Sequence, residues 1–191
     1  VDIKEVEDSE NTEIVNPPVE EDEYNPYWDY IKMNLIDVDF SKLLEINSDT
    51  KGWLQVNGTN INYPFVQTTD NGYYLKRDFN KKKNSAGWVY LDYRNNINSL
   101  DQNTIIYAHG RLNGTMFGSL KNIFDSDWFE DANNHVIKLS TENENTLWQV
   151  FSVYHIPTTS DYLKINFANG NEFLDFVNML EARSQYDFNV E

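Results

Sequence analysis

The segment from Gly52 to Phe65 constrains the fold more than any other part of this chain. Its apolar residues alternate with polar ones on both sides of an Asn57-Gly58 pair. Alternation with a period of two is typical of a strand that buries one face. Asn-Gly is the strongest short signal for a tight turn between antiparallel strands, because both positions tolerate a positive φ. The sequence therefore predicts a β-hairpin here.

Four further segments are rich in β-branched and aromatic residues and are separated by clusters of Asn, Asp and Gly. These predicted strands are Gly87–Tyr93, Thr104–His109, His135–Ser140 and Thr146–Ile156. Many short strands with frequent turns favour a β-barrel or a β-sandwich. The sequence thus indicates a mainly β fold.

Helical spacing marks three other parts of the chain. Residues 24–47 predict two short helices outside the main body, with Asp39 or Ser41 as the N-cap of the second. Ser119–Phe124 predicts a further short helix. Asn171–Ser184 carries apolar residues at spacings of three and four, which predicts an amphipathic helix.

Acidic residues are concentrated at the start of the chain. The formal net charge is -16, and residues 1–24 hold ten acids against one lysine, a net charge of -9. Such a segment buries too little apolar surface to offset its ordering entropy. We therefore predict a flexible acidic leader over residues 1–24 and one domain over residues 25–191. The acidic balance also argues against nucleic acid as a partner, because nucleic-acid binding depends on a basic surface.

No apolar run approaches the roughly 18 to 20 residues that cross a bilayer, and no signal-peptide pattern opens the chain. The 191 residues contain no cysteine, so they form no disulfide. Because the chain starts with Val1, we expect that it is part of a longer protein whose upstream segment could include a membrane anchor.

His109 is the candidate catalytic residue, because it ends a predicted strand just before a glycine-containing loop. On residue type alone, a structural histidine at a strand end is an equally good interpretation. His135 and His155 lack the local spacing of a zinc site, so we expect structural roles for both. We expect neither a metal ion nor a cofactor.

Six short blocks occur in the order that class B sortases show, and on them the chain resembles that family. The blocks are residues 52–56, 61–67, 70–75, 91–95, 106–109 and 116–120. The resemblance extends from about Trp28 to Glu191. Sortases are membrane-anchored cysteine transpeptidases of Gram-positive bacteria. They cut a sorting motif of a secreted protein and join the new carboxyl end to a cell-wall precursor or a pilin amine.

The resemblance implies a closed β-barrel with N-terminal helices and a long helix before the last two strands. Asn171–Ser184 matches that helix in position and character. The last two strands carry the family's cysteine and arginine, and the chain ends before them. We therefore expect a C-terminally incomplete barrel from a longer enzyme. Leu139-Ser140-Thr141 resembles the motif before the family cysteine, but it precedes the long helix and is not equivalent.

The family chemistry needs a cysteine thiolate, a histidine that protonates the leaving amine, and an arginine that holds the substrate and the oxyanion. His109 matches the family histidine by its place after Ile105-Ile106-Tyr107-Ala108. Ala108 stands where the family commonly has glycine, which affects the shape of the loop more than the role of His109. Three arginines do not match the family arginine in position: these are Arg94, Arg111 and Arg183.

The resemblance also implies a groove for the sorting peptide. Asn71 and Leu75 would contact the peptide from one wall, and Tyr107 from the floor. The other wall would consist of Thr158, Tyr162 and Leu163. Buried core positions are the alternative for the two leucines.

Two functions remain open from the sequence. One is a monomeric transpeptidase at the extracellular face of the membrane, held there by an N-terminal segment outside these residues. Its partners would be a sorting peptide and a cell-wall precursor or pilin amine. The other is an inactive sortase-like module that binds peptides or assists assembly. The groove would exist in both, so only the nucleophile separates them.

Overall fold

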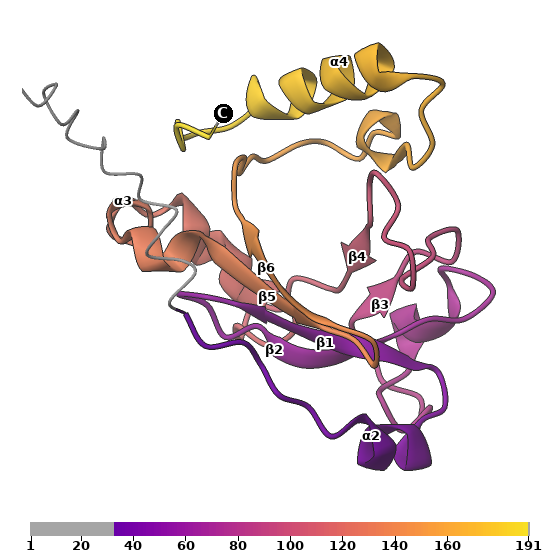
Figure 1. Ribbon diagram of the computed structural model, residues 1–191. Coiled ribbons are helices and arrows are strands. Elements are labelled where there is room, and N and C mark those ends of the chain that lie inside the picture. Colours follow the sequence, from indigo (N-terminus) through magenta and orange to yellow (C-terminus); the bar gives the residue numbers. More distant parts are fainter. Residues whose placement is uncertain (1–32, 191) are drawn as a thin grey trace, which may run out of the picture.

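A curled sheet of six strands forms the centre of the computed structural model, which describes residues 33–190 (Figure 1). The strand order is β4-β3-β2-β1-β5-β6, and short helices surround the sheet. This arrangement confirms the mainly β fold with peripheral helices. The predicted leader over residues 1–24 and the first predicted helix lie outside the described residues.

The predicted hairpin is confirmed. β1 (Thr50–Val56) and β2 (Asn62–Val66) pair antiparallel, and Gly58 in the turn has a φ of +67°. Side chains of β1 alternate between buried and half-buried, as the period of two predicts. The central core cluster has nine buried members, which are Leu54, Val56, Ile61, Phe65, Val89, Leu91, Ile97, Met116 and Leu139.

Two more strands extend the sheet beyond β1. β5 (Val136–Ser140) pairs antiparallel with β1, and β6 (Asn145–Gln149) pairs antiparallel with β5. The strand predicted to reach Ile156 stops at Gln149. The chain leaves the sheet there, because the following segment bonds to the end of the long helix instead. Its contacts include Ser152 Oγ to the Leu180 carbonyl at 2.6 Å and the Gln185 amide to the Val153 carbonyl at 2.8 Å.

On the other side of the hairpin the strands are much shorter. β3 (Tyr90–Leu91) pairs parallel with β2, and β4 (Ile106–Tyr107) pairs antiparallel with β3. Both are shorter than predicted, since polar side chains take over from the backbone ladder. The Ile105 amide donates to Asn95 Oδ1 at 2.9 Å instead of to a strand.

Three α-helices are described. α2 (Phe40–Ile46) begins at Asp39, whose side chain accepts from the Ser41 amide at 3.2 Å, so Asp39 is the N-cap. α3 is Ser126–Glu130, and α4 is Gly170–Glu181. Four 3-10 helices complete the set: η1 (Tyr73–Lys76), η2 (Gly118–Phe124), η3 (Ala132–His135) and η4 (Asp161–Leu163). The helix predicted over residues 119–124 is thus a 3-10 helix.

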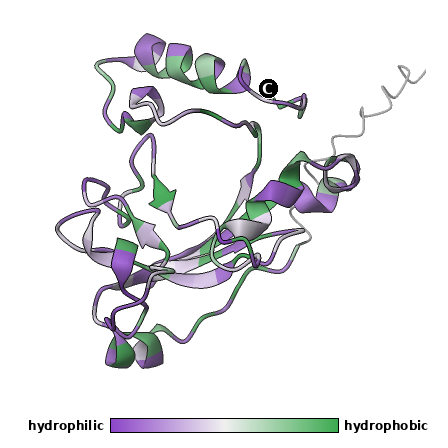
Figure 2. Cartoon of the chain, turned by 180° about the vertical axis from the view of Figure 1, so that it is seen from behind, coloured by the Kyte–Doolittle hydropathy of each residue, from purple (hydrophilic) through white to green (hydrophobic). Residues whose placement is uncertain are grey.

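α4 confirms the predicted amphipathic helix, with Asn169 accepting from the Glu172 amide at its start. It lies above the sheet and is reached by the long segment that follows β6 (Figure 1). Hydrophilic and hydrophobic residues share its surface (Figure 2), with Phe176 buried and Leu174 exposed. Among residues 33–190, no helix has the length and apolar character that crossing a membrane would require.

Candidate functional site

His109 directly follows β4 and is half-buried. Its Nδ1 atom lies 3.0 Å from the Ala86 carbonyl oxygen. A carbonyl only accepts, so Nδ1 carries the proton of this hydrogen bond. Nε2 is then the ring nitrogen left for proton transfer. A hydrogen bond to the other ring nitrogen is what orients catalytic imidazoles in general.

Gly87 lets the loop before β3 approach the imidazole. Its φ is +63°, and a Cβ placed there would lie 2.6 Å from the Tyr74 carbonyl oxygen and 3.0 Å from His109 Nδ1. The same Cβ would lie 2.9 Å from the Leu75 carbonyl oxygen. The structure therefore brings the backbone of Leu75 close to His109. The Leu75 side chain is 37% exposed, which excludes the alternative that it is a core residue.

A fully buried carboxylate, Asp92, connects two of the predicted groove residues. Tyr107 donates its hydroxyl proton to Asp92 Oδ2 at 2.8 Å, and Asn71 Nδ2 donates to the same oxygen at 3.0 Å. Arg94 donates three times, from its amide at 2.9 Å and from two guanidinium nitrogens at 2.8 Å each. We call these four residues the Asp92 network.

The electrostatics of the network keep Asp92 ionised. Burial by itself raises the pKa of Asp92, but the hydrogen bonds from Arg94, Tyr107 and Asn71 outweigh burial and hold the pKa well below its usual range. Burial, followed by the hydrogen bond to Asp92, raises the pKa of Tyr107. The pair at neutral pH is therefore a carboxylate and a neutral phenol.

The other predicted wall is held against the strand side of the site by one amide. Asn103 Nδ2 donates to the Tyr162 carbonyl at 3.2 Å and to the Lys164 carbonyl at 2.8 Å. Tyr162 and Leu163 in η4 are both half-buried, so for Leu163 the core alternative stays open. Thr158 is exposed, and no hydrogen bond joins its side chain to the rest of the site within residues 33–190.

Known proteins with this arrangement are sortases. No protein family model matches the chain. Sortase B of Listeria monocytogenes is 34% identical over 149 residues, which cover 78% of this chain and 60% of that protein. Sortase B of Staphylococcus aureus is 30% identical over 151 residues, which cover 79% and 61%. The chain spans about three fifths of the length of these two curated relatives.

Solved structures agree with these sequence relatives. A Bacillus anthracis crystal structure described as similar to sortase B has a TM-score of 0.72 and 35% identity, and the match covers 83% of this chain and 76% of that one. This chain belongs to the class B sortase family. The Staphylococcus aureus sortase B–substrate complex has a TM-score of 0.75 and 30% identity, covering 80% and 69%.

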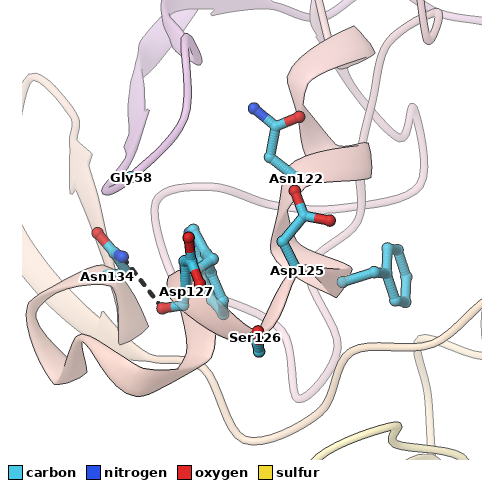
Figure 3. Close-up of a pocket in the computed structure, with 8 residues that line it drawn as sticks. Gly58, Asn122, Asp125, Ser126, Asp127 and Asn134 are labelled. Carbon is cyan, nitrogen blue, oxygen red and sulfur yellow. Dashed lines mark hydrogen bonds between the residues drawn. The ribbon is translucent and has the colours of Figure 1, made fainter.

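Two open hollows flank different parts of this sortase. The smaller, about 390 Å³, adjoins His109 and is lined by Gly110, Arg111, Leu112 and Asn113. The larger, about 640 Å³, lies among η2, α3 and the Gly58 turn (Figure 3). Because none of the predicted site residues lines the larger hollow, size alone does not locate the site. In residues 33–190, no group of three His, Cys, Asp or Glu side chains could hold a metal ion.

Sequence reasoning missed the roles of Asp92 and Ala86. Asp92 falls within a block that the chain shares with class B sortases, but its neighbours in the sequence do not show that it meets Asn71 and Tyr107. Ala86 acts through its backbone carbonyl, a group that every residue carries. No side-chain pattern could have revealed that contact.

Proposed function

We propose that this chain supplies the histidine and the peptide groove of a sortase-type cysteine transpeptidase. The observation that carries the proposal is His109. Its Nδ1 atom is fixed by the Ala86 carbonyl, its ring lies near Leu75, and Tyr107 of the same strand segment belongs to the Asp92 network. A general acid fixed beside a peptide groove is what transpeptidation requires.

The proposed reaction has two steps. A thiolate attacks the scissile carbonyl carbon, and as the C–N bond breaks, the leaving nitrogen takes the proton from Nε2 of the His109 imidazolium. A thioester and a free amine result. In the second step an acceptor amine attacks the thioester, gives a proton to Nε2, and the C–S bond breaks. The new amide and the thiolate are then formed together.

The proposed substrate is the C-terminal sorting motif of a secreted protein, and the proposed acceptor is a cell-wall peptidoglycan precursor or a pilin amine. Structures described as a sortase B–substrate complex and as sortase B complexed with triglycine support an extended peptide and an amine as ligands. We further propose that the protein acts as a monomer at the extracellular face of the membrane, anchored by an N-terminal segment.

A second candidate is a sortase-like module that binds a peptide without cleaving it. The observation that favours it is the composition, because the 191 residues include no cysteine to form the thiolate. The transpeptidase proposal therefore concerns a protein in which a cysteine accompanies these residues. Both candidates share the groove.

The test uses the protein that contains this chain, a labelled copy of the peptide from the Staphylococcus aureus complex, and triglycine. We expect mass spectrometry to detect the peptide–triglycine product with the wild type and not with His109→Ala, while both bind the peptide. His155→Ala is the matched control, since His155 is exposed and stacks on Phe124 at 3.9 Å. Undiminished product with His109→Ala would refute the role of His109. Binding without product in the wild type would favour the module.

A further inference from the structure

The buried carboxylate of Asp92 restricts what its partners can offer to a ligand. An ionised carboxylate only accepts hydrogen bonds, so every group that contacts it must donate. The Tyr107 hydroxyl therefore donates its single proton to Asp92 Oδ2. The phenol oxygen keeps its lone pairs, and towards any further partner it is an acceptor only.

Asn71 is restricted in the opposite sense. Its Oδ1 accepts from the Tyr93 amide at 3.0 Å, and one of its two Nδ2 protons goes to Asp92. The reverse orientation of the amide would place Oδ1 against the carboxylate and Nδ2 against an N–H donor, so the network fixes the orientation. The proton left on Nδ2 makes Asn71 a donor towards a further partner.

We propose that Asp92 sets the hydrogen-bond polarity of this groove wall, so that Tyr107 accepts from an N–H of the bound peptide and Asn71 donates to one of its carbonyls. The inference rests on the proposed function, because it assigns the two groups to the peptide groove. Asp92 acts through its neighbours and is a positioning residue.

The geometry suits an extended peptide. Tyr107 and Asn71 donate to the same oxygen of Asp92, so the free acceptor and the free donor lie side by side although 36 positions separate them in the chain. In an extended peptide, the N–H and the C=O of one residue point to the same side. One residue of the ligand can therefore satisfy both groups.

Arg94 keeps this polarity stable. Its guanidinium spans both oxygens of Asp92, with Nε on Oδ1 and the second nitrogen on Oδ2. A bidentate pair of this kind is strong and geometrically specific. A neutral side chain at position 92 could donate to the phenol oxygen and release the Tyr107 proton towards the groove, which would reverse the polarity there.

The experiment measures the affinity of the 191-residue chain for the labelled peptide of the Staphylococcus aureus complex and for analogues in which one backbone amide at a time is an ester. An ester lacks the N–H. We expect one ester position to weaken binding to the wild type about fivefold, the size of one neutral hydrogen bond. The same ester should not weaken binding to Tyr107→Phe. Equal losses in both proteins, or no loss at any position, would overturn the proposal.

A second arm changes the carboxylate itself. Asp92→Asn should weaken peptide binding about tenfold or more, because hydrogen bonds to a charged group are lost. Asp101→Asn is the matched control. Asp101 also accepts from an asparagine side chain, at 2.8 Å from Asn95, and it contacts neither Tyr107 nor Asn71. Equal binding by both variants would contradict the role of Asp92.

A third arm needs neither the peptide nor a folded Asp92 variant. In NMR spectra of the free wild-type chain, one Nδ2 proton of Asn71 should exchange slowly with water and the other fast. Two protons that exchange equally would overturn the assigned polarity. If the wild type shows this difference but binds no peptide, the polarity stands and the proposed function falls.

Discussion

The two halves of the sheet are built differently. β1, β2, β5 and β6 have five to seven residues each and are joined by continuous antiparallel backbone ladders. β3 and β4 have two residues each. Around them, Asp92, Asn95 and Asn103 hold the chain through side-chain hydrogen bonds to the backbone.

The difference shows how the fold makes room for a groove. Regular ladders require extended backbone and leave no free polar groups in the interior of the sheet. Where side chains replace the ladder, the backbone can turn, and loops can approach the imidazole of His109. The consequence is that the site half depends on a few buried polar groups, whereas the hairpin half depends on distributed apolar packing.

The sharpest way to test this contrast is to remove one central group from each half. Asp92→Ala should lower the free energy of unfolding by about 3 kcal/mol, at the low end for a broken buried ion pair because Arg94 is partly exposed. It should also abolish measurable peptide binding. Leu54→Ala creates a cavity in the core and should cost about 2 to 3 kcal/mol without changing peptide affinity. Urea unfolding and peptide titration measure both quantities.

Equal losses of peptide affinity in the two variants would contradict the separation of the halves. So would an Asp92→Ala variant that retains full affinity. A correction for the fraction of folded protein at the assay temperature keeps the two measurements independent.

The next effect concerns pH and His135, which precedes β5 and is 8% exposed. Burial lowers its pKa, although its hydrogen bond to the Phe129 carbonyl opposes the shift. Below the unfolded pKa of about 6.5, the unfolded chain binds a proton that the folded chain resists. Stability should therefore fall as pH falls from about 7 towards 5, and His135→Phe should remove this part of the dependence. Thermal melts across this range test it, and an unchanged slope would contradict the assignment.

The Asp92 half should respond in a lower window. The lowered pKa of Asp92 means that its contribution is complete above the unfolded value of about 3.9 and is lost as pH falls below it. Stability measured at about pH 5 should thus report on His135 and not on Asp92.

The smallest effect should come from the ion pairs that join α4 to the segment around η4. Arg183 pairs with Asp161 after the end of the helix, and Lys164 pairs with Glu172 in its first turn. Both pairs are at the surface, where salt screens them. Arg183→Gln should lower the melting temperature less than either change above, and less at about 1 M salt than at low salt. A larger loss at high salt would show that the pair is not the cause.

Most elements could be predicted from the sequence, because their signals are local. The alternation around Asn57-Gly58 determined the hairpin, and the spacing within residues 171–184 determined the amphipathic helix α4. The shared blocks identified the family. His109 stands as the predicted histidine of the site, because its place after Ile105-Ile106-Tyr107-Ala108 can be read along the chain.

Only the tertiary structure decided how the site is held. Asn71, Asp92 and Tyr107 come from three separate segments, and none of them belongs to a periodic pattern that names its partners. The shortness of β3 and β4 has the same origin, because polar side chains end both strands earlier than β propensity predicts. Propensity and periodicity describe neighbours along the chain, whereas a buried carboxylate gathers its donors in space, wherever packing leaves them without water.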